Sequence, residues 1–171
     1  KSLTGTGVKV LLIDADLRRH TATTSAAPDI DNGLRAVLSG AATLNDTVTK
    51  SEMLNADFLG AENGAAMASD LLVSPAFGSI IAQARDTYDY VLIDTPPVSV
   101  VADARAVAPH VDRILFVTRW NHTKQRQLVD GLRMFDGLDQ QPSGVVLNMI
   151  DPRRSRQFGY DLAQGQGYYS N

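Results

Sequence analysis

The sequence predicts an α/β fold with a doubly wound, mostly parallel sheet that carries helices on both faces. Two observations lead to this fold class. Short apolar runs alternate with longer stretches of helical periodicity, which is typical of β-α-β units. The runs are also mostly apolar at successive positions, as in strands buried between two helix layers, and two of them lead directly to an aspartate.

The apolar runs predict four strands and one further short strand. The run at 8–13 (VKVLLI) and the run at 89–94 (DYVLID) are expected to be buried on both faces. The other strands are expected at residues 57–59, 113–118 (RILFVT) and 145–149 (VVLNM).

Helical spacing predicts the segments between these strands. Residues 69–88 form the longest of them, because six apolar residues recur there on one helix face: Leu71, Leu72, Phe77, Ile80, Ile81 and Ala84. Shorter helices are expected at residues 33–38, 102–108 and 123–138. Residues 1–151 are therefore predicted as the folded domain. Residues 152–171 are polar and without periodicity, and are predicted as a flexible tail.

Composition excludes several classes of function. The chain has 171 residues, of which 44% are hydrophobic and 20% are charged, as in ordinary globular proteins. A net charge of -3 argues against a generally basic surface, so no nucleic-acid partner is expected. Cysteine is absent, which excludes disulfides and thiolate zinc sites. The chain begins with Lys1 rather than Met, so we expect it to be cut from a longer protein, one that could be anchored in a membrane.

Three carboxylates follow the two buried strands. Asp14 and Asp16 come directly after the first strand, and Asp94 ends the second. Because the carboxyl ends of parallel strands share one edge of a sheet, these side chains are expected at the same rim, where ligands bind. Converging carboxylates repel one another unless a cation lies among them, and Mg²⁺ with phosphate oxygens is the usual partner. The alternative is that each Asp caps a helix or accepts turn amides. Two such strand ends in one chain favour the cation site.

Two motifs carry a resemblance to a known family. VLLIDADLRR resembles the Walker A′ motif, and YVLIDTPP the Walker B motif, of the bacterial tyrosine kinases. These are deviant-Walker, MinD/ParA-like P-loop ATPase domains attached to polysaccharide co-polymerases. The likeness continues in the segments NGLRAVLSG, ADFLGAENGAAMASDLL, VSVVADA, RILFVTRWNHTK and GVVLNMID. The tail is similar to the tyrosine cluster that these kinases phosphorylate on one another, and its tyrosines are Tyr160, Tyr168 and Tyr169.

The resemblance implies an ATP-dependent protein-tyrosine autokinase with ATP and Mg²⁺ as cofactors. By that resemblance Asp94 holds Mg²⁺, Asp14 acts as base on the incoming tyrosine or helps to hold the metal, and Asp16 supports it. Asn148 is expected to face the adenine. Arg18 and Arg19 are expected to bind phosphates or acids of a neighbouring subunit, with a solvated basic turn as the alternative.

The resemblance also implies partners and a location. The kinase is expected to form a homo-oligomer in which the tail reaches a neighbouring subunit's site in trans. A cytoplasmic segment of a transmembrane co-polymerase is expected to activate it, and that segment is often fused in the same chain. These expectations place the protein at the cytoplasmic face of the bacterial inner membrane, where it regulates polymerisation and export of a polysaccharide.

The start of the chain departs from the family. A Gly-rich loop ending in Gly-Lys-Ser/Thr and then a full helix are expected before the Walker A′ strand, but only seven residues precede Val8. At a rise of about 1.5 Å per residue, a helix of three turns does not fit there. In one explanation Lys1 and Ser2 end this loop and the helix is missing from the sequence. Lys1 then reaches the β- and γ-phosphates, and the Ser2 hydroxyl binds Mg²⁺. In the other explanation the chain has no P-loop.

A second departure is His20, which stands where the family usually has Pro and is expected to alter only a turn. Two other functions stay open besides the autokinase. One is a partitioning-type ATPase that switches between monomer and dimer, and the other is a non-catalytic adaptor that binds no nucleotide. The autokinase is favoured because only it uses both the acidic rim and the tyrosine tail.

Overall fold

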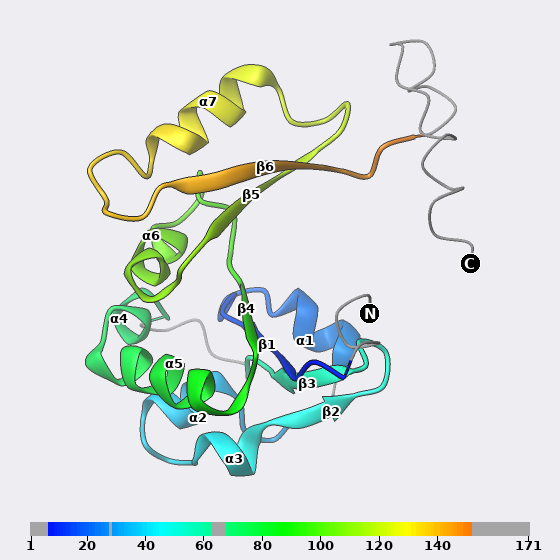
Figure 1. Cartoon of the computed structure of the whole chain (residues 1–171), viewed down its shortest axis with the longest axis vertical. Helices are drawn as coiled ribbons and strands as arrows, with labels where there is room; N and C mark the ends of the chain where they lie inside the picture. The colour runs from blue at the N-terminus through cyan, green and yellow to red at the C-terminus, as the bar shows by residue number, and fades with distance from the viewer. Residues whose placement is uncertain (1–6, 28, 63–67, 152–171) are drawn as a thin grey trace. The chain divides into compact units, whose positions relative to one another are not determined.

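A computed structural model of the chain describes residues 7–27, 29–62 and 68–151 (Figure 1). The chain forms two compact units, Lys1–Val111 and Asp112–Asn171. The division into a folded domain at 1–151 and a tail at 152–171 stays a prediction, because the tail lies outside the described residues.

The first unit is built on a four-stranded sheet in the order β2-β3-β1-β4. Its strands are β1 (Val10–Asp14), β2 (Thr49–Ser51), β3 (Ala56–Leu59) and β4 (Tyr90–Asp94). β1 runs parallel to β3 and to β4, whereas the short edge strand β2 runs antiparallel to β3. The predicted α/β class with a mostly parallel sheet is confirmed.

Six helices of the described part of the first unit surround the sheet. They are α1 (Thr21–Ala26), α2 (Leu34–Leu38), α3 (Leu44–Thr47), α4 (Ala68–Leu72), α5 (Pro75–Thr87) and α6 (Asp103–Val107), the last followed by a 3-10 turn at Ala108–His110. Leu11 and Ile13 of β1 are fully buried in a core with Leu34 of α2 and Phe77 of α5. Figure 1 shows α2 and α5 side by side under the sheet. α1 lies at the carboxyl end of β1, where Thr23 bonds to Asp14.

The second unit is a parallel pair of strands with a helix between them in sequence. β5 (Ile114–Arg119) pairs with β6 (Pro142–Asn148), and α7 (Gln125–Arg133) connects them. Parallel strands need such a crossover, which explains the helix at this place. Among the helices in the described parts of both units, none is long and apolar enough to cross a membrane.

Two helix predictions were wrong in extent. Residues 69–88 do not form one helix but two, α4 and α5, with Val73 and Ser74 between them. Pro75 is the cause, because proline has no N–H to donate and its ring clashes with the preceding turn, so it begins α5 instead of continuing α4. The helix predicted at 123–138 covers only Gln125–Arg133.

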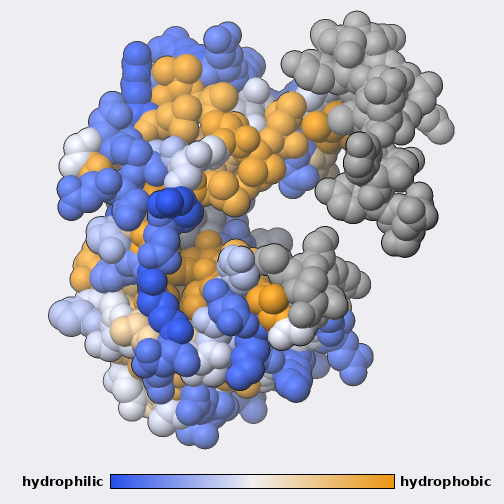
Figure 2. Space-filling view, in the orientation of Figure 1, coloured by the Kyte–Doolittle hydropathy of each residue, from blue (hydrophilic) through white to orange (hydrophobic). Residues whose placement is uncertain are grey.

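The predicted burial of β4 was also wrong. Tyr90 and Leu92 are 49% and 46% exposed, whereas Leu11 and Ile13 on β1 are fully buried. Val91 and Ile93, on the face shared with Leu11 and Ile13, pack against the core, whereas Tyr90 and Leu92 lie on the opposite face of β4, which stays open. In the second unit, Leu115, Val117 and Leu147 of the two strands are also at least half exposed. Figure 2 shows apolar surface on this unit.

The start of α2 generates a prediction about Gly33. The Glu62 carboxylate accepts hydrogen bonds from the N–H groups of Arg35 and Ala36, in the first turn of α2, and Gly60 O accepts one from Leu34 N at 2.7 Å. A Cβ on Gly33 would collide with both Gly60 O and Glu62 Oε2. Gly33→Ala is therefore expected to lower the free energy of unfolding by about 1–3 kcal/mol, measured by urea denaturation.

Gly144→Ala is the matched control for this measurement. A Cβ there meets nothing closer than Leu115 Cδ2 at 3.9 Å, so stability should be unchanged or slightly higher. Equal effects of the two substitutions would show that the space around Gly33 is not limiting.

Candidate active site

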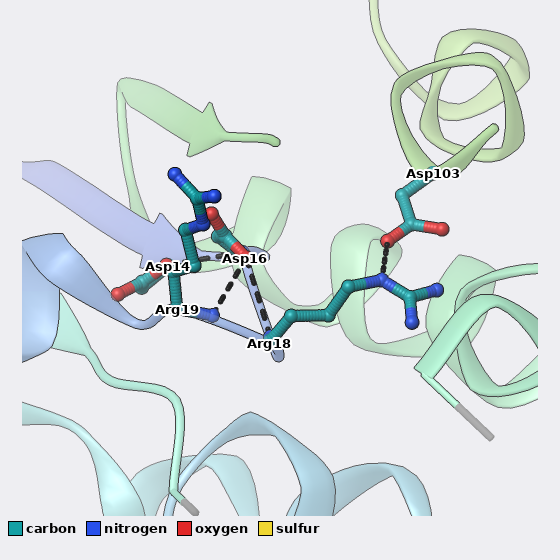
Figure 3. Close-up of polar contacts among 5 residues, drawn as sticks. All are labelled: Asp14, Asp16, Arg18, Arg19 and Asp103. Atoms are coloured by element: carbon teal, nitrogen blue, oxygen red, sulfur yellow. Dashed lines mark hydrogen bonds and ion pairs between the residues drawn. The ribbon is translucent and has the colours of Figure 1, made fainter. Parts of the chain in front are cut away.

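The carboxyl ends of β1 and β4 form one rim. Asp14 and Asp94 are direct partners in the register of these parallel strands, and Ala15 N donates to Asp94 O at 2.8 Å. Asp16 lies two residues beyond Asp14, in the turn that follows the strand (Figure 3). The prediction that both acid-bearing strand ends reach the same rim is confirmed.

Asp14 is turned into the protein. Its side chain is fully buried, and Oδ1 accepts a hydrogen bond from Asp16 N at 3.0 Å. Oδ2 accepts two more, from Thr23 N at 2.9 Å and from Thr23 Oγ1 at 2.7 Å. A buried carboxylate needs such donors to offset the loss of water. The carboxylate of Asp14 therefore organises the turn, the first helix and the strand end around itself.

Asp16 holds the turn but keeps one oxygen open. Oδ1 accepts from Arg18 N at 3.2 Å and from Arg19 N at 3.0 Å, which is a typical local use of aspartate in a turn. Among the residues that the structure describes, nothing donates to Oδ2. The half-buried Asp16 therefore has one carboxylate oxygen available to a ligand.

Asp94 lies in a negative field at the exposed end of β4. Partial burial raises the pKa of its carboxyl group, and the negative charges of Asp14 and Asp16 raise it further, while a hydrogen bond from the Thr95 backbone opposes the shift. A cation near Asp94 would relieve this repulsion. Carboxylate oxygen is also the ligand type that Mg²⁺ prefers, so the residues present fit the metal.

The described residues contain no group of three or more His, Cys, Asp or Glu side chains arranged to hold a metal ion. A metal ion bound here would have Asp94 as one protein ligand, and other oxygens would occupy the remaining positions. This is the usual situation of Mg²⁺, which keeps several waters and binds through one or two carboxylates and substrate phosphates.

Arg18 connects the Asp16 turn to α6. Its Nε donates to Asp103 Oδ2 at 3.4 Å, and Asp103 is fully buried in the first turn of that helix (Figure 3). The predicted use of Arg18 for phosphate binding is thus in competition with an ion pair inside the unit. Arg19 is exposed and stays a candidate for phosphate or a neighbouring subunit's acids.

Two residues of the site escaped the sequence analysis. Thr23 gave no signal, because the segment TATTSA has no apolar period and three similar hydroxyl residues surround it. Asp103 was noted only for its place in the family pattern. A charged residue inside the mostly apolar segment VSVVADARAVA was the available signal for a buried ion pair.

His20 departs from the family in its backbone. It adopts the left-handed conformation with φ 37° before α1, and its Nδ1 is buried with no hydrogen-bond partner among the described residues. Proline cannot adopt this angle, because its ring fixes φ near about -65°. The altered turn that the sequence predicted here is therefore consistent with the observed backbone.

Other predicted site residues lie elsewhere or outside the described chain. Asn148 ends β6 in the second unit, where it is exposed and its Oδ1 accepts from Met149 N at 2.8 Å. Lys1 and Ser2 lie outside the described residues, and so do the tail tyrosines Tyr160, Tyr168 and Tyr169. The roles assigned to these residues stay predictions.

Comparison with known proteins points to one family. A family model described as an AAA domain matches residues 1–122. The succinoglycan biosynthesis transport protein ExoP of Rhizobium meliloti (strain 1021) is 36% identical over 154 residues, which is 87% of this chain and 19% of that protein. The tyrosine-protein kinase wzc of Salmonella typhi is 36% identical over 162 residues, which is 94% of this chain and 22% of that kinase. The chain spans about a fifth of the length of these curated relatives.

Solved structures agree with this result. The VpsO kinase domain is 30% identical with a TM-score of 0.79, over 88% of this chain and 74% of that one. The kinase domain of the Escherichia coli tyrosine kinase ETK is 29% identical with a TM-score of 0.78, over 86% of this chain and 58% of that one. The septum site-determining protein MinD of Pyrococcus horikoshii, 21% identical with a TM-score of 0.70 over 91% of this chain and 67% of that one, shares the fold.

Burial and the negative charges around Asp94 predict that, without Mg²⁺, the Asp94→Asn variant is more stable than wild type by an amount that depends on pH. Because its pKa is raised above the ordinary 3.8, the folded chain keeps a proton on Asp94 at pH values where the unfolded chain has lost it. Ionised Asp94 therefore costs the folded chain stability, and the cost grows as pH rises through the raised pKa. Thermal melts should show the variant above wild type near neutral pH, with the gap closing toward about pH 4. A gap that is independent of pH, or a less stable variant at neutral pH, would contradict this assignment.

Proposed function

The chain belongs to the AAA domain family and resembles the kinase domains of bacterial tyrosine kinases over most of its length, and from this premise we propose that it is an ATP-dependent protein-tyrosine autokinase. Its process is the polymerisation and export of an exopolysaccharide or capsule, since matched relatives include a succinoglycan transport protein. The observation that carries the proposal is the acidic rim, where Asp14, Asp16 and Asp94 come together at the carboxyl ends of β1 and β4.

Asp94 is the proposed protein ligand of Mg²⁺. It is exposed at the end of β4, and the charges of Asp14 and Asp16 make the rim favourable for a cation. Mg²⁺ held there would neutralise the negative charge that develops on the phosphates of ATP during the transfer. Lys1 and Ser2 are proposed to bind the phosphates and the metal as the end of a Gly-Lys-Ser loop, and Asn148 to face the adenine.

Asp16 is the proposed proton acceptor. The sequence assigned this role to Asp14 and a supporting role to Asp16. Asp14 has no exposed oxygen and accepts three hydrogen bonds, whereas Oδ2 of Asp16 accepts none from the described residues. A base must reach the proton that it removes, which favours Asp16.

The reaction that follows needs little covalent help from the protein. As the tyrosine oxygen attacks, its proton passes to Asp16 Oδ2. A bond forms between that oxygen and the γ-phosphorus, and the bond from the γ-phosphorus to the β–γ bridging oxygen breaks to release ADP. Asp16 then returns the proton to solvent. Positioning and charge neutralisation supply most of the rate enhancement in such transfers.

The proposed substrates are the tail tyrosines of a second copy, namely Tyr160, Tyr168 and Tyr169. Oligomerisation, phosphorylation in trans and activation by a cytoplasmic segment of a transmembrane co-polymerase belong to the same proposal. So does a place at the cytoplasmic face of the inner membrane. The support is the resemblance to a succinoglycan transport protein and a tyrosine-protein kinase, each about five times the length of this chain.

Substitution of the rim carboxylates tests the proposal. In the intact protein with ATP and Mg²⁺, Asp94→Asn and Asp16→Asn should each slow phosphotyrosine formation by about a hundredfold or more, since one removes the metal ligand and the other the base. Asp86→Asn, an exposed residue of α5 away from the rim, should stay within about twofold of wild type. Phosphate incorporation followed by mass spectrometry gives the rates.

The same assay separates the other functions. ATP turnover by the wild type without any phosphotyrosine would replace the kinase with a partitioning-type ATPase. No nucleotide binding by calorimetry would replace it with an adaptor. A fully active Asp16→Asn variant would leave the kinase in place but remove Asp16 as its base.

Tyr88 is expected to stay unmodified although it is close in sequence to the rim strand. Its hydroxyl donates to Asp57 Oδ2 at 2.9 Å, and burial together with Asp57 raises the pKa of Tyr88 to about 12. A hydroxyl that holds its proton this firmly and is already bonded is a poor nucleophile at neutral pH. Mass spectrometry of the autophosphorylated protein should find no phosphate on Tyr88, even after all three tail tyrosines are changed to Phe. Phosphate on Tyr88 in the folded protein would contradict this.

A further inference from the structure

Thr23 joins three parts of the first unit at one buried point. It is 3% exposed and lies in the first turn of α1. Its N–H and its hydroxyl both donate to Asp14 Oδ2, at 2.9 and 2.7 Å. The same hydroxyl oxygen accepts a hydrogen bond from Ala61 N at 2.7 Å. The hydroxyl group therefore connects the end of β1 to the residues that follow β3.

Close packing leaves Thr23 little freedom. The Thr23 Cγ2 methyl would lie 3.0 Å from a Cβ placed on Gly60, so the residue before Ala61 comes near enough to exclude a larger side chain. Ala61 itself is buried, and its N–H would have no acceptor without the hydroxyl. An unpaired buried N–H costs stability, so loss of the Thr23 hydroxyl would leave both the Asp14 carboxylate and the Ala61 N–H short of a hydrogen bond.

This arrangement fixes the direction of the Asp14 carboxylate. Two of its three hydrogen bonds come from Thr23, and the third comes from Asp16 N at 3.0 Å. With Oδ2 held toward α1 and Oδ1 held by the turn, Asp14 places Asp16 through its backbone. It also contributes a fixed negative charge beside Asp94.

We propose that Thr23 is a positioning residue of the active site. It holds the Asp14 carboxylate inside the protein, which leaves an oxygen of Asp16 to accept the tyrosine proton and the Asp94 carboxylate to bind the metal. The proposal rests on the proposed kinase function for its consequence in catalysis. The placement of Asp14 itself is a property of the folded chain and can be measured without ATP.

The experiment compares three substitutions in the intact protein. Thr23→Val removes the hydroxyl at nearly constant shape, and Thr23→Ser restores it. Thr24→Val is the matched control, because Thr24 is the exposed neighbour in the same helix and its hydroxyl donates only to His20 O at 3.1 Å. Amide hydrogen exchange at Ala61 and Asp16 reports this placement, and phosphotyrosine formation with ATP and Mg²⁺ reports its consequence.

Thr23→Val is expected to speed exchange at Ala61 and Asp16 by about tenfold or more, while Thr23→Ser and Thr24→Val exchange like wild type. The same variant should lower kcat by about tenfold, because it misplaces the Asp16 carboxylate through the turn. It should change the KM for ATP less than kcat, because Asp94 is placed by the pairing of β1 with β4. Thr23→Ser should recover kcat to within about twofold.

Several results would overturn the proposal. Unchanged exchange in Thr23→Val would show that the hydroxyl does not hold Ala61 and Asp14. Faster amide exchange with wild-type kcat would show that Thr23 contributes to stability only. A Thr23→Ser variant with a kcat as low as that of Thr23→Val would show that the hydroxyl is not the group that positions Asp14. If the wild type forms no phosphotyrosine, the proposed kinase function fails, while the exchange data still decide whether Thr23 locks Asp14.

Discussion

The buried charge of Asp14 is the constraint on which the rest of the site depends. A carboxylate without access to water is tolerated only where donors surround it, and here they come from the turn after β1 and the first turn of α1. Thr23 then draws in the residues after β3 through Ala61 N. The turn after β1, the first turn of α1 and the residues after β3 converge at the end of one strand because a single carboxylate has to be satisfied there.

The negative charge of Asp14 also disfavours the ionised form of the neighbouring Asp94 carboxyl group. Parallel pairing of β1 with β4 places Asp94 opposite Asp14, and the resulting repulsion is not relieved by any lysine or arginine among the contacts described at the rim. Arg18 is the nearest candidate along the chain, but its guanidinium pairs with Asp103 on α6. The rim therefore keeps a concentration of negative charge that a bound cation would offset.

Sequence reasoning located the rim but not what holds it. The strands at Val10–Asp14 and Tyr90–Asp94 were predictable, because uninterrupted apolar runs followed by polar residues have few other structures. Thr23 and Asp103 were not, because their contacts depend on residues 9 and 85 positions away, and local patterns do not encode such pairings. The exposure of β4 was missed for a related reason: an apolar run shows that a strand can be buried, but what packs on each face of the sheet decides whether it is.

The spacing Asp-x-Asp-x-Arg acquires a physical meaning from these contacts. Asp14, still in the strand, turns inward to α1, while Asp16, already in the turn, bonds the N–H groups of Arg18 and Arg19 and keeps its other oxygen open. Arg18 can then reach Asp103 with its side chain while its backbone closes the turn. Asp14 thus fixes the end of β1 to α1, Asp16 keeps one oxygen open to a ligand, and Arg18 connects the turn to α6. The spacing of the motif thus gives its two carboxylates different surroundings, one fully buried and the other with an oxygen that no described residue donates to.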